Sequence, residues 1–62
     1  MTINELMKNN TNRFEADIEV CDLHTLNFVY LGKYGNMPVK LNDAIIESWF
    51  AYMGGVYIEA YL

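Results

Sequence analysis

Cysteine, histidine and proline each occur once in this chain of 62 residues, and lysine and arginine together occur only four times. A single cysteine excludes an internal disulfide and is typical of a reducing compartment. No apolar run approaches the roughly 20 residues of a membrane-spanning helix, and no basic-then-apolar leader opens the chain. We therefore expect a cytoplasmic protein that does not enter a membrane.

The scarcity of basic residues leaves a strong excess of negative charge. Eight acidic residues against four basic ones give a net charge of −4, which repels nucleic-acid phosphates and attracts basic surfaces. Direct nucleic-acid binding is therefore not expected. The composition is nevertheless 53% hydrophobic, which is typical of a chain that folds around a core. The length predicts a single domain over 1–62 of marginal stability.

Two segments have the pattern of short helices. Thr2 and Glu5 have the spacing of a capping box, in which each side chain satisfies a free backbone N–H at a helix start. Apolar residues follow on one helical face, and an asparagine-rich segment then ends the pattern. We predict a helix over 3–9, and a further helical turn over 41–44 that Pro38 opens.

A first hairpin is predicted from alternation. Residues 14–20 alternate between apolar and acidic side chains, which is the period of a half-buried strand. Residues 25–31 are rich in β-branched and aromatic side chains, and the four residues between the two segments suit a hairpin loop. This interpretation pairs Val20 with Thr25 and places Phe14 opposite Leu31.

The segment 45–53 has two interpretations. A capped helix would align its apolar residues on one stripe and end at Gly54. A strand would instead form a hairpin with the last residues of the chain, because the Gly-Gly pair tolerates the positive φ angles of a tight turn. We prefer the strand, since pairing Met53 with Val56 sorts both strands into an apolar face and a tyrosine-rich face.

These elements predict an α+β fold with a small antiparallel sheet of about four strands in two hairpins and short helices on one face. The uncovered face would suit a protein interface, because aromatic rings bury large areas and acids select basic partners. The alternative is that strands favour tyrosine and phenylalanine for cross-strand packing alone. The candidate partner-binding residues are Glu15, Asp17, Glu19, Phe28, Tyr30, Phe50, Tyr52, Tyr57, Glu59 and Tyr61.

Three of these acids form a regular series. Glu15, Asp17 and Glu19 would project from one strand face at intervals of about 6.8 Å, twice the rise per residue. This interval is close to the separation of phosphates along a nucleic-acid strand, so the series is compatible with a nucleic-acid mimic. The favoured alternative is a solvated strand face that keeps the sheet soluble.

Neither a metal site nor catalysis is expected. Cys21 and His24 form a C-x-x-H pair, but structural zinc takes four ligands and the chain has no other cysteine or histidine. Only a symmetric dimer would complete such a site, and two incidental turn residues are the favoured interpretation. His24 is also the only conventional general base, and no motif places it in a mechanism. We predict no cofactor and no enzymatic activity.

Three features carry a resemblance along the whole chain: the acidic alternating strand from Phe14 to Val20, the Tyr30-Leu31-Gly32 run with the later Pro38, and the glycine-turned final hairpin. In these features the sequence resembles small acidic α+β proteins of phages and other mobile elements. Some proteins of that class inhibit host defence, including anti-CRISPR and anti-restriction proteins. The resemblance implies an inhibitor that docks on a basic site of a host nucleic-acid-binding defence protein, and it transfers no catalytic residue.

Two other functions stay open at this point. One is a structural homodimer or larger homo-oligomer, in which the aromatic face or the edge strand that ends at Leu62 pairs with a second copy. The other is a small metal-dependent or DNA-associated regulator.

Overall fold

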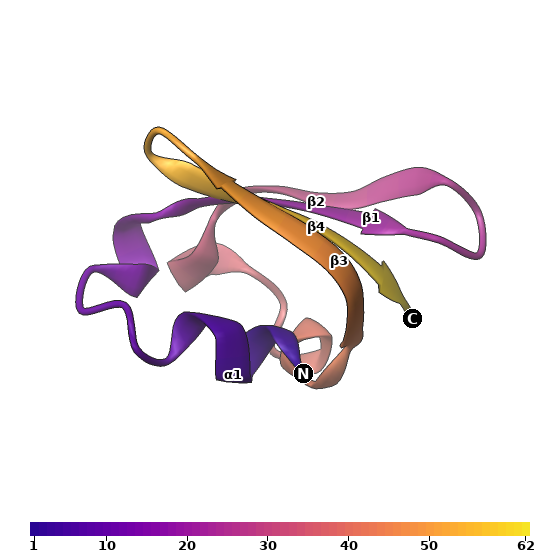
Figure 1. Ribbon diagram of the computed structural model, residues 1–62, viewed down its shortest axis with the longest axis horizontal. Coiled ribbons are helices and arrows are strands. Elements are labelled where there is room, and N and C mark those ends of the chain that lie inside the picture. Colours follow the sequence, from indigo (N-terminus) through magenta and orange to yellow (C-terminus); the bar gives the residue numbers. More distant parts are fainter.

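A four-stranded sheet forms one layer of the molecule, and helical turns cover one of its two faces (Figure 1). The computed structural model describes all 62 residues. The strands are β1 (Asp17–Asp22), β2 (Asn27–Lys33), β3 (Ile45–Tyr52) and β4 (Gly55–Tyr61). The covering layer consists of the helix α1 (Ile3–Met7) and three 3-10 turns, η1 (Arg13–Glu15), η2 (Tyr34–Asn36) and η3 (Val39–Asp43). None of these helical segments is long and apolar enough to cross a membrane.

The strand order is β2-β1-β4-β3, with two antiparallel hairpins joined by a parallel pairing of β1 with β4. The sheet is therefore mixed. The broad α+β prediction is confirmed, but the expectation of a purely antiparallel sheet is wrong, and the helical content is small. The strand that ends near Leu62, expected at an edge, is central instead. Strands β1 and β4 carry the fully buried strand residues, so they lie side by side in the middle of the sheet, where they run parallel.

The core lies between the central strands and the covering turns. Ile18 and Val20 of β1 pack with Ile58 and Ala60 of β4, and all four side chains are fully buried. The covering layer contributes a second set of buried side chains, namely Ile3, Met7, Tyr34, Met37, Leu41 and Ala44. The core is thus one continuous cluster on one side of the sheet.

Helix α1 begins as the sequence predicts. The backbone N–H of Thr2 donates to Glu5 Oε1 at 2.8 Å, and the N–H of Glu5 donates to Thr2 Oγ1 at 3.1 Å, which completes the capping box. The helix ends at Met7 rather than at residue 9. The helical turn that Pro38 opens is also present, as η3, although it spans Val39–Asp43.

The first hairpin differs from its prediction in both boundaries and register. Residues 13–15 form η1, so β1 begins only at Asp17, and Phe14 stacks on Tyr34 with ring centroids 6.1 Å apart. The loop is Leu23–Leu26, and Val20 lies opposite Tyr30 instead of Thr25. The side chain of Asp22 explains the shift, because its Oδ1 accepts the His24 N–H at 2.9 Å and fixes the turn two residues later than predicted.

The strand interpretation of 45–53 is confirmed, with β3 reaching Tyr52. The turn is Met53-Gly54 rather than Gly54-Gly55, and Gly54 adopts a positive φ of 82°. Val56 therefore lies opposite Ala51 instead of Met53. Because strand side chains alternate with a period of two, this displacement by two positions leaves both predicted faces unchanged.

Replacing Ile58 with alanine should lower the free energy of unfolding by about 2–5 kcal/mol, because it leaves a cavity between β1, β4 and α1. Val39→Ala, at an exposed position in η3, is the control and should change stability little. Urea unfolding followed by far-UV circular dichroism measures both. Equal losses in the two variants would contradict this description of the core.

Candidate protein-binding face

The sheet face opposite the helical turns has no covering layer (Figure 1). We call it the open face, and the strand register assigns its residues. Three acids lie there from the two central strands, with aromatic side chains on both sides of them. Its side chains are those of Asp17, Glu19, Cys21, Phe28, Leu31, Lys33, Ile45, Ser48, Phe50, Tyr52, Tyr57, Glu59 and Tyr61. The face therefore combines negative charge with aromatic surface, as the sequence predicts.

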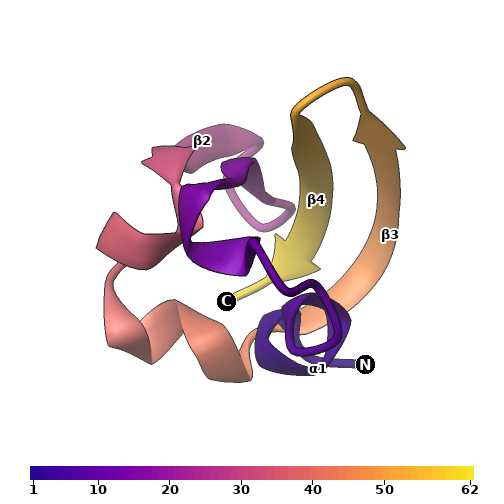
Figure 2. The same ribbon diagram turned by 90° about the vertical axis from the view of Figure 1, so that its left-hand side faces the viewer.

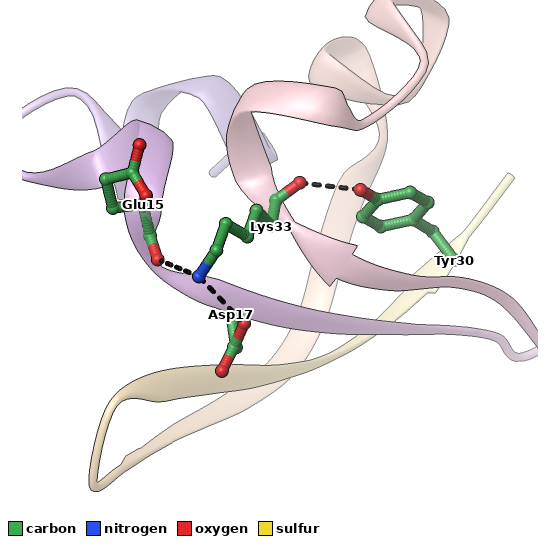
Figure 3. A network of polar contacts seen from close by, with 4 residues as sticks. All are labelled: Glu15, Asp17, Tyr30 and Lys33. Carbon is green, nitrogen blue, oxygen red and sulfur yellow. Dashed lines mark hydrogen bonds and ion pairs between the residues drawn. The ribbon is translucent and has the colours of Figure 1, made fainter.

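Two of the predicted site residues, Tyr30 and Glu15, do not belong to the open face. Val29 has no partner in β1, and this bulge turns Tyr30 to the covered side, where it packs against the core. The Tyr30 hydroxyl donates to the Lys33 carbonyl at 2.6 Å. Glu15 lies in η1 instead of a strand, and its side chain and that of Asp17 point in opposite directions (Figure 3). Strand alternation could not predict either displacement.

The edge of the open face next to β2 contains its one basic side chain. Lys33 Nζ lies 3.7 Å from Asp17 Oδ1 and donates to the Glu15 carbonyl at 3.1 Å (Figure 3). Of the predicted series of three acids, only Asp17 and Glu19 remain on this face, and the first of them has a basic partner. The series of acids expected for a phosphate mimic is therefore reduced from three residues to two.

Glu59 lies at the centre of the open face and accepts two hydrogen bonds. Ser48 Oγ donates to its Oε1 at 2.6 Å, and the Tyr57 hydroxyl donates to its Oε2 at 3.0 Å. Both bonds lower the pKa of Glu59 below its usual value, and the bond from Ser48 has the larger effect. In turn, the bond to Glu59, together with desolvation and the Glu59 charge, raises the pKa of Tyr57 to about 12. The carboxylate is thus held ionised, and both its oxygens are fixed in position.

Aromatic rings form a continuous row around this carboxylate. The Tyr57 ring centroid lies 5.1 Å from that of Phe50 on β3 and 6.2 Å from that of Phe28 on β2. Phe28 and Phe50 are 53% and 57% exposed, although both belong to strands. The row therefore crosses the sheet from one edge strand to the other and presents apolar surface to solvent.

Tyr52 extends the aromatic row toward the β3–β4 turn. A Cβ atom on Gly55 would lie 2.7 Å from the Tyr52 hydroxyl and 2.7 Å from the Asp17 carbonyl, so the Tyr52 ring lies directly over the glycine backbone. Desolvation, and then the charges of Glu19 and Asp17, raise the pKa of Tyr52. The negative potential of the two acids thus reaches the aromatic side chains.

The two residues considered for metal binding or catalysis, Cys21 and His24, lie in different parts of the first hairpin. His24 is exposed in the first hairpin loop, where its ring meets the edge of Tyr61 at a centroid distance of 5.0 Å. Cys21 is a buried free thiol on the open-face side of β1. No group of three or more His, Cys, Asp or Glu side chains is placed to hold a metal ion.

Sequence reasoning missed the hydrogen-bonding role of Ser48. The predicted register placed Phe50 opposite Glu59, whereas the actual register places Ser48 there. Lys33 was missed because the predicted strand stopped at residue 31 and β2 continues to Lys33. The sequence did place Ser48 on the tyrosine-rich face, but only the register shows that its hydroxyl donates a hydrogen bond to Glu59.

No protein-family model matches this chain, and no curated protein or solved structure is significantly similar to it. Its function is therefore inferred from the geometry of the open face.

Replacing Ser48 with alanine should raise the pKa of Glu59 toward its usual value of 4.5. The variant loses the hydrogen bond from Ser48, which lowers this pKa more than the bond from Tyr57 does. A carboxyl whose folded pKa is depressed stabilises the fold above its unfolded pKa, and this contribution is lost as the pH falls through the folded pKa. The variant should therefore lose less stability on acidification. NMR titration of the Glu59 carboxyl measures the pKa, with Thr11→Ala at an exposed loop position as the control. An unchanged Glu59 pKa in Ser48→Ala would refute the hydrogen bond.

Proposed function

We propose that this protein is a non-catalytic binding module that docks through its open face on a basic surface of a partner protein. The observation that carries this proposal is the Glu59 carboxylate, which Ser48 and Tyr57 hold ionised and oriented between exposed aromatic rings. A fixed carboxylate loses little further freedom when a guanidinium or ammonium group pairs with it. Charge-assisted hydrogen bonds of this kind are among the stronger polar contacts.

The aromatic row supplies the apolar part of the interface. Rings have few rotatable bonds, so they bury large areas at low entropic cost, and they are enriched among the residues that dominate binding energy. Phe28 and Phe50 are already held in place by their contacts with Tyr57. They therefore serve as the anchors, while Tyr52 and Tyr61 extend the contact area along both ends of the face.

The charge of the open face selects the partner. Asp17, Glu19 and Glu59 outweigh Lys33, whose ammonium group is itself engaged by Asp17. An acidic patch within an acidic protein accelerates encounter with a basic surface and repels nucleic-acid phosphates. The partner is accordingly a protein with exposed arginine and lysine residues.

Nucleic-acid-binding enzymes present such basic surfaces, and the resemblance to small acidic phage proteins points to the same class. The proposed activity is inhibition of a host nucleic-acid-binding defence protein in the host cytoplasm, by occupation of the basic site that the nucleic acid would use. Binding of this kind is stoichiometric and needs no catalytic residue or cofactor.

Affinity capture from a lysate of the natural host tests the proposal, with the retained protein quantified at low and at high salt. We expect one basic nucleic-acid-binding protein, retained at low salt and reduced at high salt because exposed charges are screened. Glu59→Gln and Phe50→Ala should each weaken binding by about tenfold or more, which is the usual cost of truncating a central interface residue. The matched controls are Asp43→Asn and Val39→Ala, both exposed in η3 on the covered side.

Capture that survives both open-face variants, or that falls equally in the η3 controls, would refute docking through this face. Capture of a partner with no basic surface would refute the electrostatic selection.

A further inference from the structure

Strand β3 is an edge of the sheet, and no segment of the chain lies beside most of its length (Figure 2). The N-terminus closes only its first two residues, where the Ile46 N–H donates to the Met1 carbonyl at 2.8 Å and Thr2 forms a bridge with Ile45. A two-residue turn closes on a hydrogen-bonded pair, here Tyr52 with Gly55. The backbone N–H and C=O groups of Trp49 and Ala51 therefore point away from β4.

The open part of this edge is apolar and exposed. Every residue of β3 except Ile46 is exposed, and the side chain of Trp49, the only tryptophan, is 44% exposed. The five residues 48–52 carry no charge, and Glu47 stands at the bulge that precedes them. Edge strands are ordinarily protected by charges, proline or bulges. On the opposite edge, the β2 bulge at Val29 interrupts the middle of the strand, whereas the β3 bulge at Glu47 precedes residues 48–52 and leaves them unprotected.

We propose that β3 pairs antiparallel with β3 of a second copy of this chain, which joins the two sheets into one. The two-fold axis passes beside Phe50, which lies opposite Phe50 of the partner subunit. Trp49 then lies opposite Ala51 of the partner subunit, and Ser48 lies opposite Tyr52 of the partner subunit. Trp49 and Tyr52 thus each meet a small side chain, the two Phe50 rings meet at the axis, and the outward backbone groups of Trp49 and Ala51 find partners.

Charge favours this arrangement over stacking of the open faces. Two open faces in contact would bring their carboxylates together, whereas in the edge pairing Glu47 lies opposite Met53 of the partner subunit. A two-fold axis perpendicular to the sheet also leaves both open faces exposed on the same side. The carboxylates of both open faces therefore stay accessible to a basic partner in the dimer, and the two surfaces share only residues of β3 such as Phe50.

Sedimentation velocity over a concentration series, together with Trp49 fluorescence, tests the dimer on the purified protein. We expect dimer formation with rising concentration, and with it a shift of the emission to shorter wavelength as the indole loses water. Ala51→Pro should weaken dimerisation by about tenfold or more, because each copy loses one outward donor. Proline is tolerated in edge strands where the N–H faces solvent, so the hairpin itself should persist.

Trp49→Lys places a charge on the β3 edge and should weaken the dimer by a route independent of Ala51→Pro. Because this variant lacks the tryptophan, sedimentation velocity alone measures its dimerisation. The control is Val29→Lys, which places the same charge on the β2 edge and should leave the dimer unchanged. Far-UV circular dichroism checks the fold of each variant. A monomer at every concentration, a dimer that survives Trp49→Lys, or an equal loss in Val29→Lys would overturn the proposal. Glu59→Gln should dimerise normally, so failure here and failure of docking are distinguishable.

Discussion

Strands β1 and β4 lie side by side at the centre of the sheet, and their parallel pairing is the only strand contact between the two hairpins. It brings Val20 opposite Ile58 and Ile18 opposite Val56, and α1 then closes the core over these side chains. Burial of this apolar surface is the main stabilising contribution in a domain of this size. The chain has helical turns enough to cover only one face of the sheet, so the pairing that builds the core also leaves the opposite face uncovered.

The open face takes its rigidity from the same two strands. Glu19, Tyr57 and Glu59 alternate along the backbone with the buried residues, so packing on the covered side fixes their positions on the other side. The hydrogen bonds from Ser48 and Tyr57 then fix the Glu59 carboxylate itself. The acidic and aromatic side chains of this face are therefore ordered in the free protein, and order of this kind lowers the entropy cost of any contact a surface makes.

The central position of β1 and β4 also determines which strands become edges. The edge strand β2 is interrupted by a bulge in its middle and ends in a lysine, whereas β3 presents an uninterrupted, uncharged run after its bulge at Glu47. The open face and the β3 edge meet at β3 but differ in chemistry. The face combines negative charge with aromatic rings, and the edge offers unpaired backbone N–H and C=O groups.

Local patterns in the sequence determined which segments form elements and which side of each strand is apolar. The capping box of Thr2 and Glu5, the η3 turn after Pro38 and the two faces of the β3–β4 hairpin were all predictable, the last because a displacement by two residues preserves alternation. Only the tertiary structure decided the parallel pairing, the η1 turn that removes Glu15, the bulge that turns Tyr30 to the core, and the register that brings Ser48 to Glu59. These features depend on contacts between segments far apart in the chain, and alternation within one strand carries no information about which strand lies beside it or in which register.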